Sequence, residues 1–156
     1  MRRYLGLELE VKCSIQLELL PRMARQPLLK HLNERIVCCA LGTLEKVVAA
    51  LYEQTMHPPE KIHAPWVAHN EAQAHCGLRW LEALPGQRWL ALDRLTQADI
   101  TTVAMFDFAR IVNPALVISE LYPRLDALSA HCNTLSAFAA TRPVGDVDRA
   151  NPTLPT

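Results

Sequence analysis

The chain has 156 residues, of which 50% are apolar and 21% are charged, enough for one well-packed domain and too apolar for global disorder. Sixteen basic residues balance sixteen acidic ones, which argues against the basic excess typical of nucleic-acid or anionic-membrane proteins. Only five glycines are present, which favours helices over a turn-rich β fold. The odd count of five cysteines and the lack of a long apolar run predict reduced thiols in a cytoplasmic protein.

The first segment alternates apolar and polar residues from Leu5 to Leu19. A period of two predicts a half-buried strand, yet no second strand is evident downstream. The segment would therefore pair with another chain, lie on the helices, or be a remnant of another domain. Glu8 and Glu10 interrupt it, so we expect no signal peptide.

Between Pro27 and Pro58, apolar residues recur every three or four positions, which predicts one long helix over residues 27–55. Gly42 weakens the middle of this helix, and we expect a bend or the close approach of another element there. The predicted core face comprises Leu29, Leu32, Ile36, Ala40, Leu44, Val47 and Leu51.

Pro65 suits the first position of a second helix that ends before Pro85-Gly86. The loop over residues 87–95 is apolar enough to pack on the core. One face of this helix carries Trp66, Asn70, Gln73, Gly77, Trp80 and Leu84, and beside that face lie Val67, Leu78 and Leu81.

Thr96-Gln97-Ala98-Asp99 has the spacing of a capping box, in which Asp99 bonds back to the N–H of Thr96. Leu95 and Ile100 are placed as its hydrophobic staple. We therefore assign Asp99 a structural role rather than a catalytic one.

The helix that begins at this box carries Asp107 and Arg110, whose spacing predicts a local ion pair. Pro114 interrupts it, and Pro123 starts another helix. These boundaries predict three parts of the chain: an extended segment over residues 1–20, a helical domain over 21–143 and a tail over 144–156. The predicted fold is an all-α bundle of about five helices.

The ordered set of motifs resembles the helical C-terminal domain of glutathione S-transferases, over roughly residues 19–143. The residues that carry the resemblance are Leu19-Leu20-Pro21, Gly42, Tyr52-Glu53, Pro59-Glu60-Lys61, Trp66, Leu78-Arg79-Trp80-Leu81-Glu82-Ala83-Leu84, Leu95-Thr96-Gln97-Ala98-Asp99-Ile100, Tyr122-Pro123-Arg124-Leu125 and Phe138-Ala139-Ala140-Thr141-Arg142-Pro143.

This resemblance implies a family reaction in which a glutathione thiolate attacks an electrophile. It also implies that the helices form the site for the electrophilic acceptor, with Asn33, Val37 and Tyr52 as candidate lining residues. The thioredoxin-like domain that binds glutathione is largely missing, and no catalytic Tyr, Ser or Cys motif is present. The chain is therefore expected to be a truncated or stand-alone member, weak or inactive alone, with no cofactor and with glutathione as co-substrate only if the missing site is supplied.

The alternative function is a non-catalytic assembly module, as a homodimer or with a protein partner that covers the exposed domain face. We expect no nucleic-acid or membrane partner. Metal binding is not expected, because six-residue spacing turns successive histidines to different sides of a helix: His57, His63, His69 and His75. Cys38 and Cys39 diverge on a helix, and at least one should be packed in the core.

Overall fold

The computed structural model describes residues 22–141, with side chains from residue 27 onward. Over this range the chain forms five α-helices and one short 3-10 helix: α2 (Arg22–Met56), η1 (Pro59–Lys61), α3 (Ala64–Glu82), α4 (Gln97–Val112), α5 (Pro123–Cys132) and α6 (Ser136–Thr141). No strand occurs between residues 22 and 141, so the predicted all-α fold is confirmed. The predicted strand within residues 1–20 and the tail over 144–156 lie outside the described residues.

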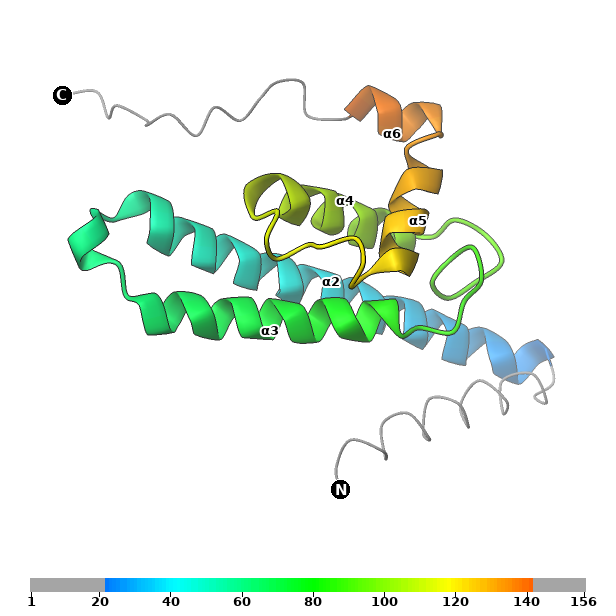
Figure 1. Ribbon diagram of the computed structural model, residues 1–156. Coiled ribbons are helices and arrows are strands. Elements are labelled where there is room, and N and C mark those ends of the chain that lie inside the picture. Colours follow the sequence, from blue (N-terminus) through cyan, green and yellow to red (C-terminus); the bar gives the residue numbers. More distant parts are fainter. Residues whose placement is uncertain (1–21, 142–156) are drawn as a thin grey trace.

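The long helix α2 and helix α3 run antiparallel and side by side (Figure 1). Helix α4 also packs on α2, and α5 packs on α4 and α3. None of the described helices is both long and apolar enough to cross a bilayer. The largest apolar side chains of the core that are almost fully buried come from all four long helices and the segments between them: Ile36, Leu78, Leu81, Leu90, Val103, Met105, Phe106, Tyr122 and Leu125.

Helix α2 begins at Arg22, five residues earlier than predicted, and Pro27 lies inside it. A proline at this position removes one intrahelical hydrogen bond and crowds the carbonyl one turn earlier, a local cost that the 29 helical residues after it can offset. Thr43 of α2 is buried, and its hydroxyl donates to the carbonyl oxygen of Cys39 at 2.8 Å.

The glycine that permits close approach of two helices is Gly77 of α3, and the expected close approach at Gly42 is wrong. An added Cβ at residue 77 would lie 2.0 Å from the hydroxyl oxygen of Thr43, whereas one at Gly42 would meet no atom within 4 Å. The helices α2 and α3 therefore touch backbone to side chain at Gly77 and Thr43.

The buried face of α3 is displaced from the face that carries Trp66 and Gln73. Trp66 is 45% exposed and Gln73 is exposed, although Asn70 is buried. A rotation of the helix by about one residue position turns a neighbouring row of smaller apolar residues toward α2 and α4. The buried residues of α3 are Val67, Asn70, Ala74, Leu78 and Leu81.

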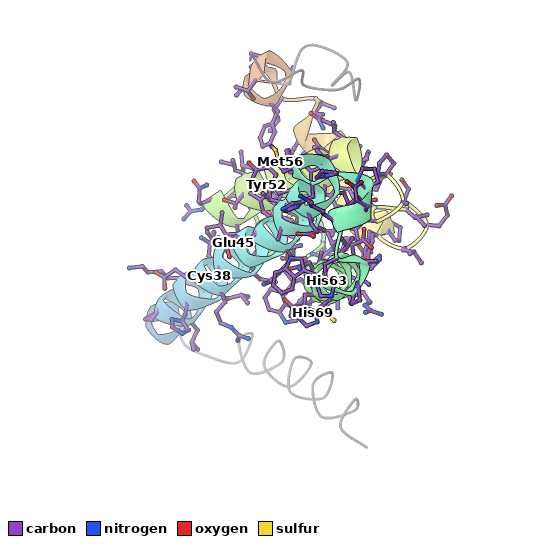
Figure 2. All side chains as sticks on the ribbon, turned by 90° about the vertical axis from the view of Figure 1, so that its left-hand side faces the viewer. Cys38, Glu45, Tyr52, Met56, His63 and His69 are labelled. Carbon is purple, nitrogen blue, oxygen red and sulfur yellow. The ribbon has the colours of Figure 1, made fainter. Side chains whose placement is uncertain are left out.

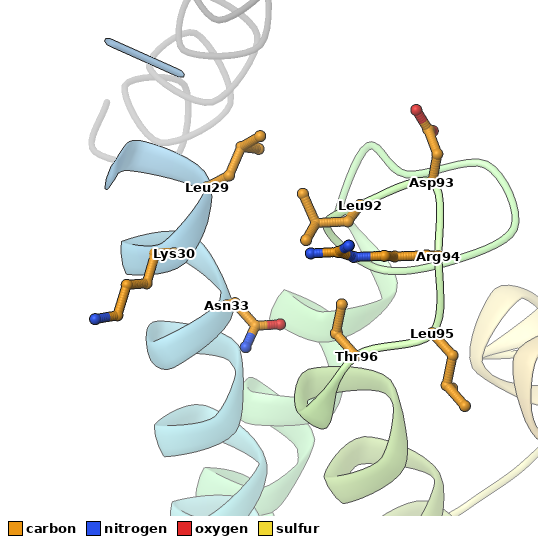
Figure 3. Close-up of a pocket in the computed structure, with 8 residues that line it drawn as sticks. All are labelled: Leu29, Lys30, Asn33, Leu92, Asp93, Arg94, Leu95 and Thr96. Carbon is orange, nitrogen blue, oxygen red and sulfur yellow. The ribbon is translucent and has the colours of Figure 1, made fainter. Parts of the chain in front are cut away.

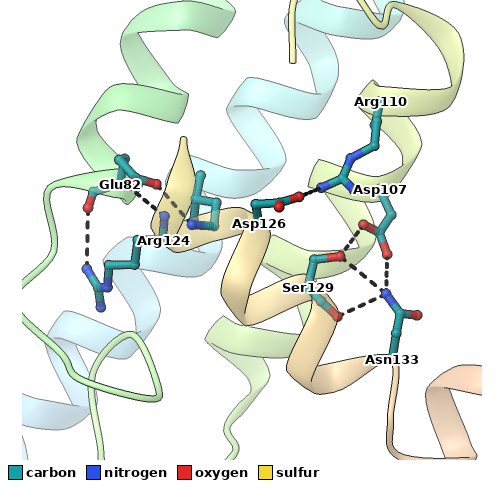
Figure 4. A network of polar contacts seen from close by, with 8 residues as sticks. Glu82, Asp107, Arg110, Arg124, Asp126, Ser129 and Asn133 are labelled. Carbon is teal, nitrogen blue, oxygen red and sulfur yellow. Dashed lines mark hydrogen bonds and ion pairs between the residues drawn. The ribbon is translucent and has the colours of Figure 1, made fainter. Parts of the chain in front are cut away.

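A network of polar contacts joins α4 to α5 (Figure 4). Arg110 pairs with Asp126 at 2.6 Å, and Asp107 accepts hydrogen bonds from the Ser129 hydroxyl at 2.5 Å and the Asn133 amide at 3.1 Å. The predicted ion pair between Asp107 and Arg110 is therefore wrong. Each residue finds a better-placed partner on α5 than on its own helix.

The start of α5 is capped by a side chain from another helix. Glu82, the last residue of α3, accepts the backbone N–H groups of Arg124 and Leu125 on its two carboxylate oxygens, both at 2.9 Å (Figure 4). A carboxylate at this end also suits the positive end of the helix dipole. The cap therefore joins the start of α5 to the end of α3.

Candidate functional site

The buried carboxylate of Asp99 ties the loop before α4 to the start of that helix. One oxygen accepts the backbone N–H and the hydroxyl of Thr96 at 2.8 and 2.7 Å, and both halves of the capping box are present. The other oxygen accepts the N–H of Leu90 at 2.8 Å. Of the staple residues, Leu95 packs against the core, while Ile100 is 39% exposed. Asp99 has no exposed surface, so its role is to fix the loop over residues 90–96.

An open cavity of about 890 Å³ lies between that loop and α2 (Figure 3). In Figure 3 the Arg94 side chain extends from the loop toward α2, and Asn33 points from α2 toward the loop. The lining combines three leucines with one amide, three charged groups and a hydroxyl: Leu29, Lys30, Asn33, Leu92, Asp93, Arg94, Leu95 and Thr96.

Asn33 is the most informative residue of this cavity. Its side-chain oxygen is buried and has no hydrogen-bond partner. Leaving a buried polar atom unpaired costs roughly 1–3 kcal/mol, so a bound donor at this position would be favourable. Lys30 is mostly exposed and lies 4.0 Å from Glu34, a weak surface pair that leaves its charge available.

The other two candidate acceptor residues do not join Asn33. Val37 is half-buried and packs against the core, and it does not line the cavity. Tyr52 is 55% exposed and sits about 28 Å along α2 from Asn33, at 1.5 Å per residue. Tyr52 therefore does not line the cavity at Asn33. Figure 2 shows Tyr52 and Met56 on the outer side of α2.

Sequence reasoning missed the loop half of this cavity. Leu92, Asp93 and Arg94 follow no motif, and they reach α2 only because Asp99 holds the loop back against the helix start. The capping-box spacing was the one signal that could have drawn attention to this loop.

The thiols and histidines do not form a second site. No group of three or more potential metal ligands occurs among residues 22–141. Burial raises the pKa of Cys39, whose thiol donates to the Gly77 carbonyl at 3.9 Å, and burial raises that of Cys132 to about 11. His75 is half-buried, and its ring forms a hydrogen bond with the Tyr122 hydroxyl at 2.6 Å.

The sequence and fold of this chain are similar to those of known proteins. The family model of the glutathione S-transferase C-terminal domain matches residues 55–136, just over half of the chain. No curated protein matches the sequence. A glutathione S-transferase from Methylobacterium radiotolerans, crystallised in complex with glutathione sulfonate, superposes with a TM-score of 0.66 at 24% identity.

That superposition covers 70% of this chain and 51% of the other, so this chain spans about half the length of that transferase. At this identity the likeness establishes the fold. The family match rests on the segment that contains α3, the capping box of α4 and the capped start of α5. By this match and by its fold, the chain belongs to the glutathione S-transferase family, whose helical C-terminal domain it contains.

Proposed function

We propose that this chain forms the acceptor-side wall of a glutathione S-transferase site and does not catalyse conjugation alone. The observation that carries the proposal is the cavity at Asn33, which opens between α2 and the loop before α4 in a chain of this family. Its location on the first long helix agrees with the place where the resemblance puts the electrophilic acceptor.

The lining suits an electrophile with polar substituents. Leu29 and Leu92 provide apolar surface for its body, and Lys30 and Arg94 provide cations for electron-rich oxygens. The Asn33 oxygen offers an acceptor for a bound donor. The reaction itself would join the thiolate sulfur of glutathione to an electrophilic carbon, with loss of a leaving group or protonation of the product.

The cavity wall contains no group suited to activate a thiol. Among the described residues that line it there is no Tyr, Ser or Cys, and the one hydroxyl, that of Thr96, already donates to Asp99. We therefore expect the thiol-activating group to be absent from this wall.

The four described cysteines are free thiols, which supports a reducing compartment such as the cytoplasm.

The test combines turnover and binding. The full chain should convert glutathione and 1-chloro-2,4-dinitrobenzene no faster than the uncatalysed reaction. In calorimetry, the dinitrophenyl conjugate should bind, and glutathione alone should not. Asn33→Leu should weaken conjugate binding, whereas Tyr52→Ala, a change far from the cavity, should not.

Two outcomes contradict the proposal. Turnover well above the uncatalysed rate would mean that the chain carries its own thiol-activating group. Failure of the conjugate to bind, or equal binding by both variants, would remove the cavity as an acceptor site and leave the assembly function.

The assembly alternative is favoured by one observation, an exposed apolar stripe along the outer side of α2. Leu41, Tyr52 and Met56 are 48, 55 and 66% exposed and lie on the same side of α2, with the exposed Glu45 between Leu41 and Tyr52. Figure 2 labels Glu45, Tyr52 and Met56. Such a stripe on a helix suits contact with a second copy or a protein partner. Light scattering would report a dimer that Tyr52→Glu dissociates if this function holds, and a monomer at all concentrations if it does not.

A further inference from the structure

A second, smaller cavity lies between the loop after α3 and one side of α5. Its volume is about 210 Å³, below the usual range of sites for drug-sized ligands. None of its lining residues belongs to the cavity at Asn33: Gln87, Arg88, Leu90, Arg124, Ala127, Leu128 and His131.

Arg124 is the half-buried charge of this cavity. No ion pair among residues 27–141 includes it, and its guanidinium reaches only the backbone carbonyls of Glu82 and Trp89, both at 3.5 Å. The Glu82 carboxylate is already engaged by backbone N–H groups at the start of α5. Burial lowers the pKa of Arg124, although Glu82 and Asp99 act in the opposite direction. The guanidinium, which stays protonated as arginine does in proteins, is therefore incompletely solvated.

A second arginine and a histidine also line this cavity, together with the amide side chain of Gln87. Arg88 is exposed, and His131 lies with its ring 5.1 Å from that of Trp89. Neither is part of an ion pair in the described part of the chain. No carboxylate is among the described residues that line the cavity, whereas Leu90 and Leu128 give it an apolar floor.

We propose that this cavity binds a small organic oxyanion, a phosphate ester or a carboxylate on a short apolar body. Arginine presents a planar fork of donors that matches the oxygens of either anion, and two arginines, Arg88 and Arg124, line this cavity. The apolar body rests against Leu90 and Leu128, and the small volume excludes larger ligands. This inference is independent of the proposed transferase function.

Calorimetric titration of the full chain tests it with three matched probes: phenyl phosphate, benzoate and neutral benzamide. An anionic probe should bind saturably and more weakly as salt rises, and benzamide should not bind. The tighter of the two anions identifies the ligand class. Arg88→Gln should weaken binding about tenfold, the effect of losing one charged hydrogen bond.

The matched control is Arg79→Gln, which removes an exposed arginine of α3 outside the cavity. It should leave the affinity unchanged. Absence of binding by both anions at millimolar concentration would overturn the proposal, as would equal binding of benzamide. An equal loss of affinity in Arg79→Gln and Arg88→Gln would reduce the effect to general surface charge.

Discussion

Asp99 shows how one side chain can set the geometry of a cavity that it does not line. Its carboxylate is fully buried and accepts three hydrogen bonds, two from Thr96 and one from Leu90. The spacing of Thr96 and Asp99 predicts the contact within the capping box. The bond to Leu90 depends on the loop folding back over the helix start, which no local pattern encodes.

Replacing Asp99 by Ala should lower the free energy of unfolding by roughly 3 kcal/mol, because a cap is lost and the buried N–H of Leu90 is left unpaired. Urea unfolding monitored by circular dichroism measures this change. The matched control is Asp93→Ala, an exposed carboxylate of the same loop. Similar losses in both variants would show that the buried contacts of Asp99 contribute little.

The α2–α3 pair is the element on which the remaining helices assemble. The two helices approach closely at Gly77, where the α3 backbone meets the Thr43 side chain. Gly42 lies on α2 only one residue from Thr43, yet its Cβ position is open. Gly77 is therefore required by the close contact with Thr43, whereas the space around Gly42 would accept a side chain.

Gly77→Ala should destabilise the protein by about 1–3 kcal/mol, because overpacking outweighs the higher helix propensity of alanine. Gly42→Ala should instead stabilise it by up to about 1 kcal/mol. Combining Gly77→Ala with Thr43→Ala should recover part of the loss, since the clashing hydroxyl is removed. Urea midpoints of these three variants and of the unmodified chain decide, and a stabilising Gly77→Ala would contradict the close approach.

The sequence predicts the elements better than their mutual orientation. Pro65 and Pro123 mark helix starts by their own backbone chemistry, and α3 and α5 begin next to them. The rotation of α3 and the partner of Arg110 depend instead on contacts between residues distant in the sequence. Arg110 pairs with Asp126, sixteen positions away, which spacing within one helix cannot reveal.

In the candidate site, too, the sequence predicts the helix but not which of its residues face the cavity. Asn33 lies on a helix that periodicity predicts, and it does line the cavity. Tyr52 shares that helix but faces outward, because it lies on the side of α2 opposite the buried residues Val47 and Ala50. The loop residues that complete the cavity have no local signal.

At the scale of the whole molecule, polar contacts connect α3 to the segment between α4 and α5. Glu71 accepts the Asn113 amide at 2.9 Å, and His75 bonds the hydroxyl of buried Tyr122 at 2.6 Å. The Tyr122 ring also meets Phe106 of α4 edge-on. One histidine–tyrosine pair therefore fastens three parts of the chain around the core.

This fastening should make stability depend on pH. Burial, aided by the positive charge of Arg79 and opposed by Glu71, lowers the pKa of His75 below 6.5. Between that lowered pKa and 6.5 the unfolded chain binds more protons at this site than the native one. The stabilisation is therefore complete above pH 6.5 and is lost as pH falls through the lowered pKa.

Urea midpoints at about pH 7.5 and pH 5.5 measure this effect, with part of any fall arising from carboxylates elsewhere. His75→Gln keeps a hydrogen-bonding group for Tyr122 but removes the titration, so its midpoint should fall less than that of the unmodified chain. His69→Gln, which changes an exposed histidine of the same helix, should fall as much as the unmodified chain. If His75→Gln loses stability as steeply as His69→Gln, the pair between His75 and Tyr122 does not couple protonation to the fold.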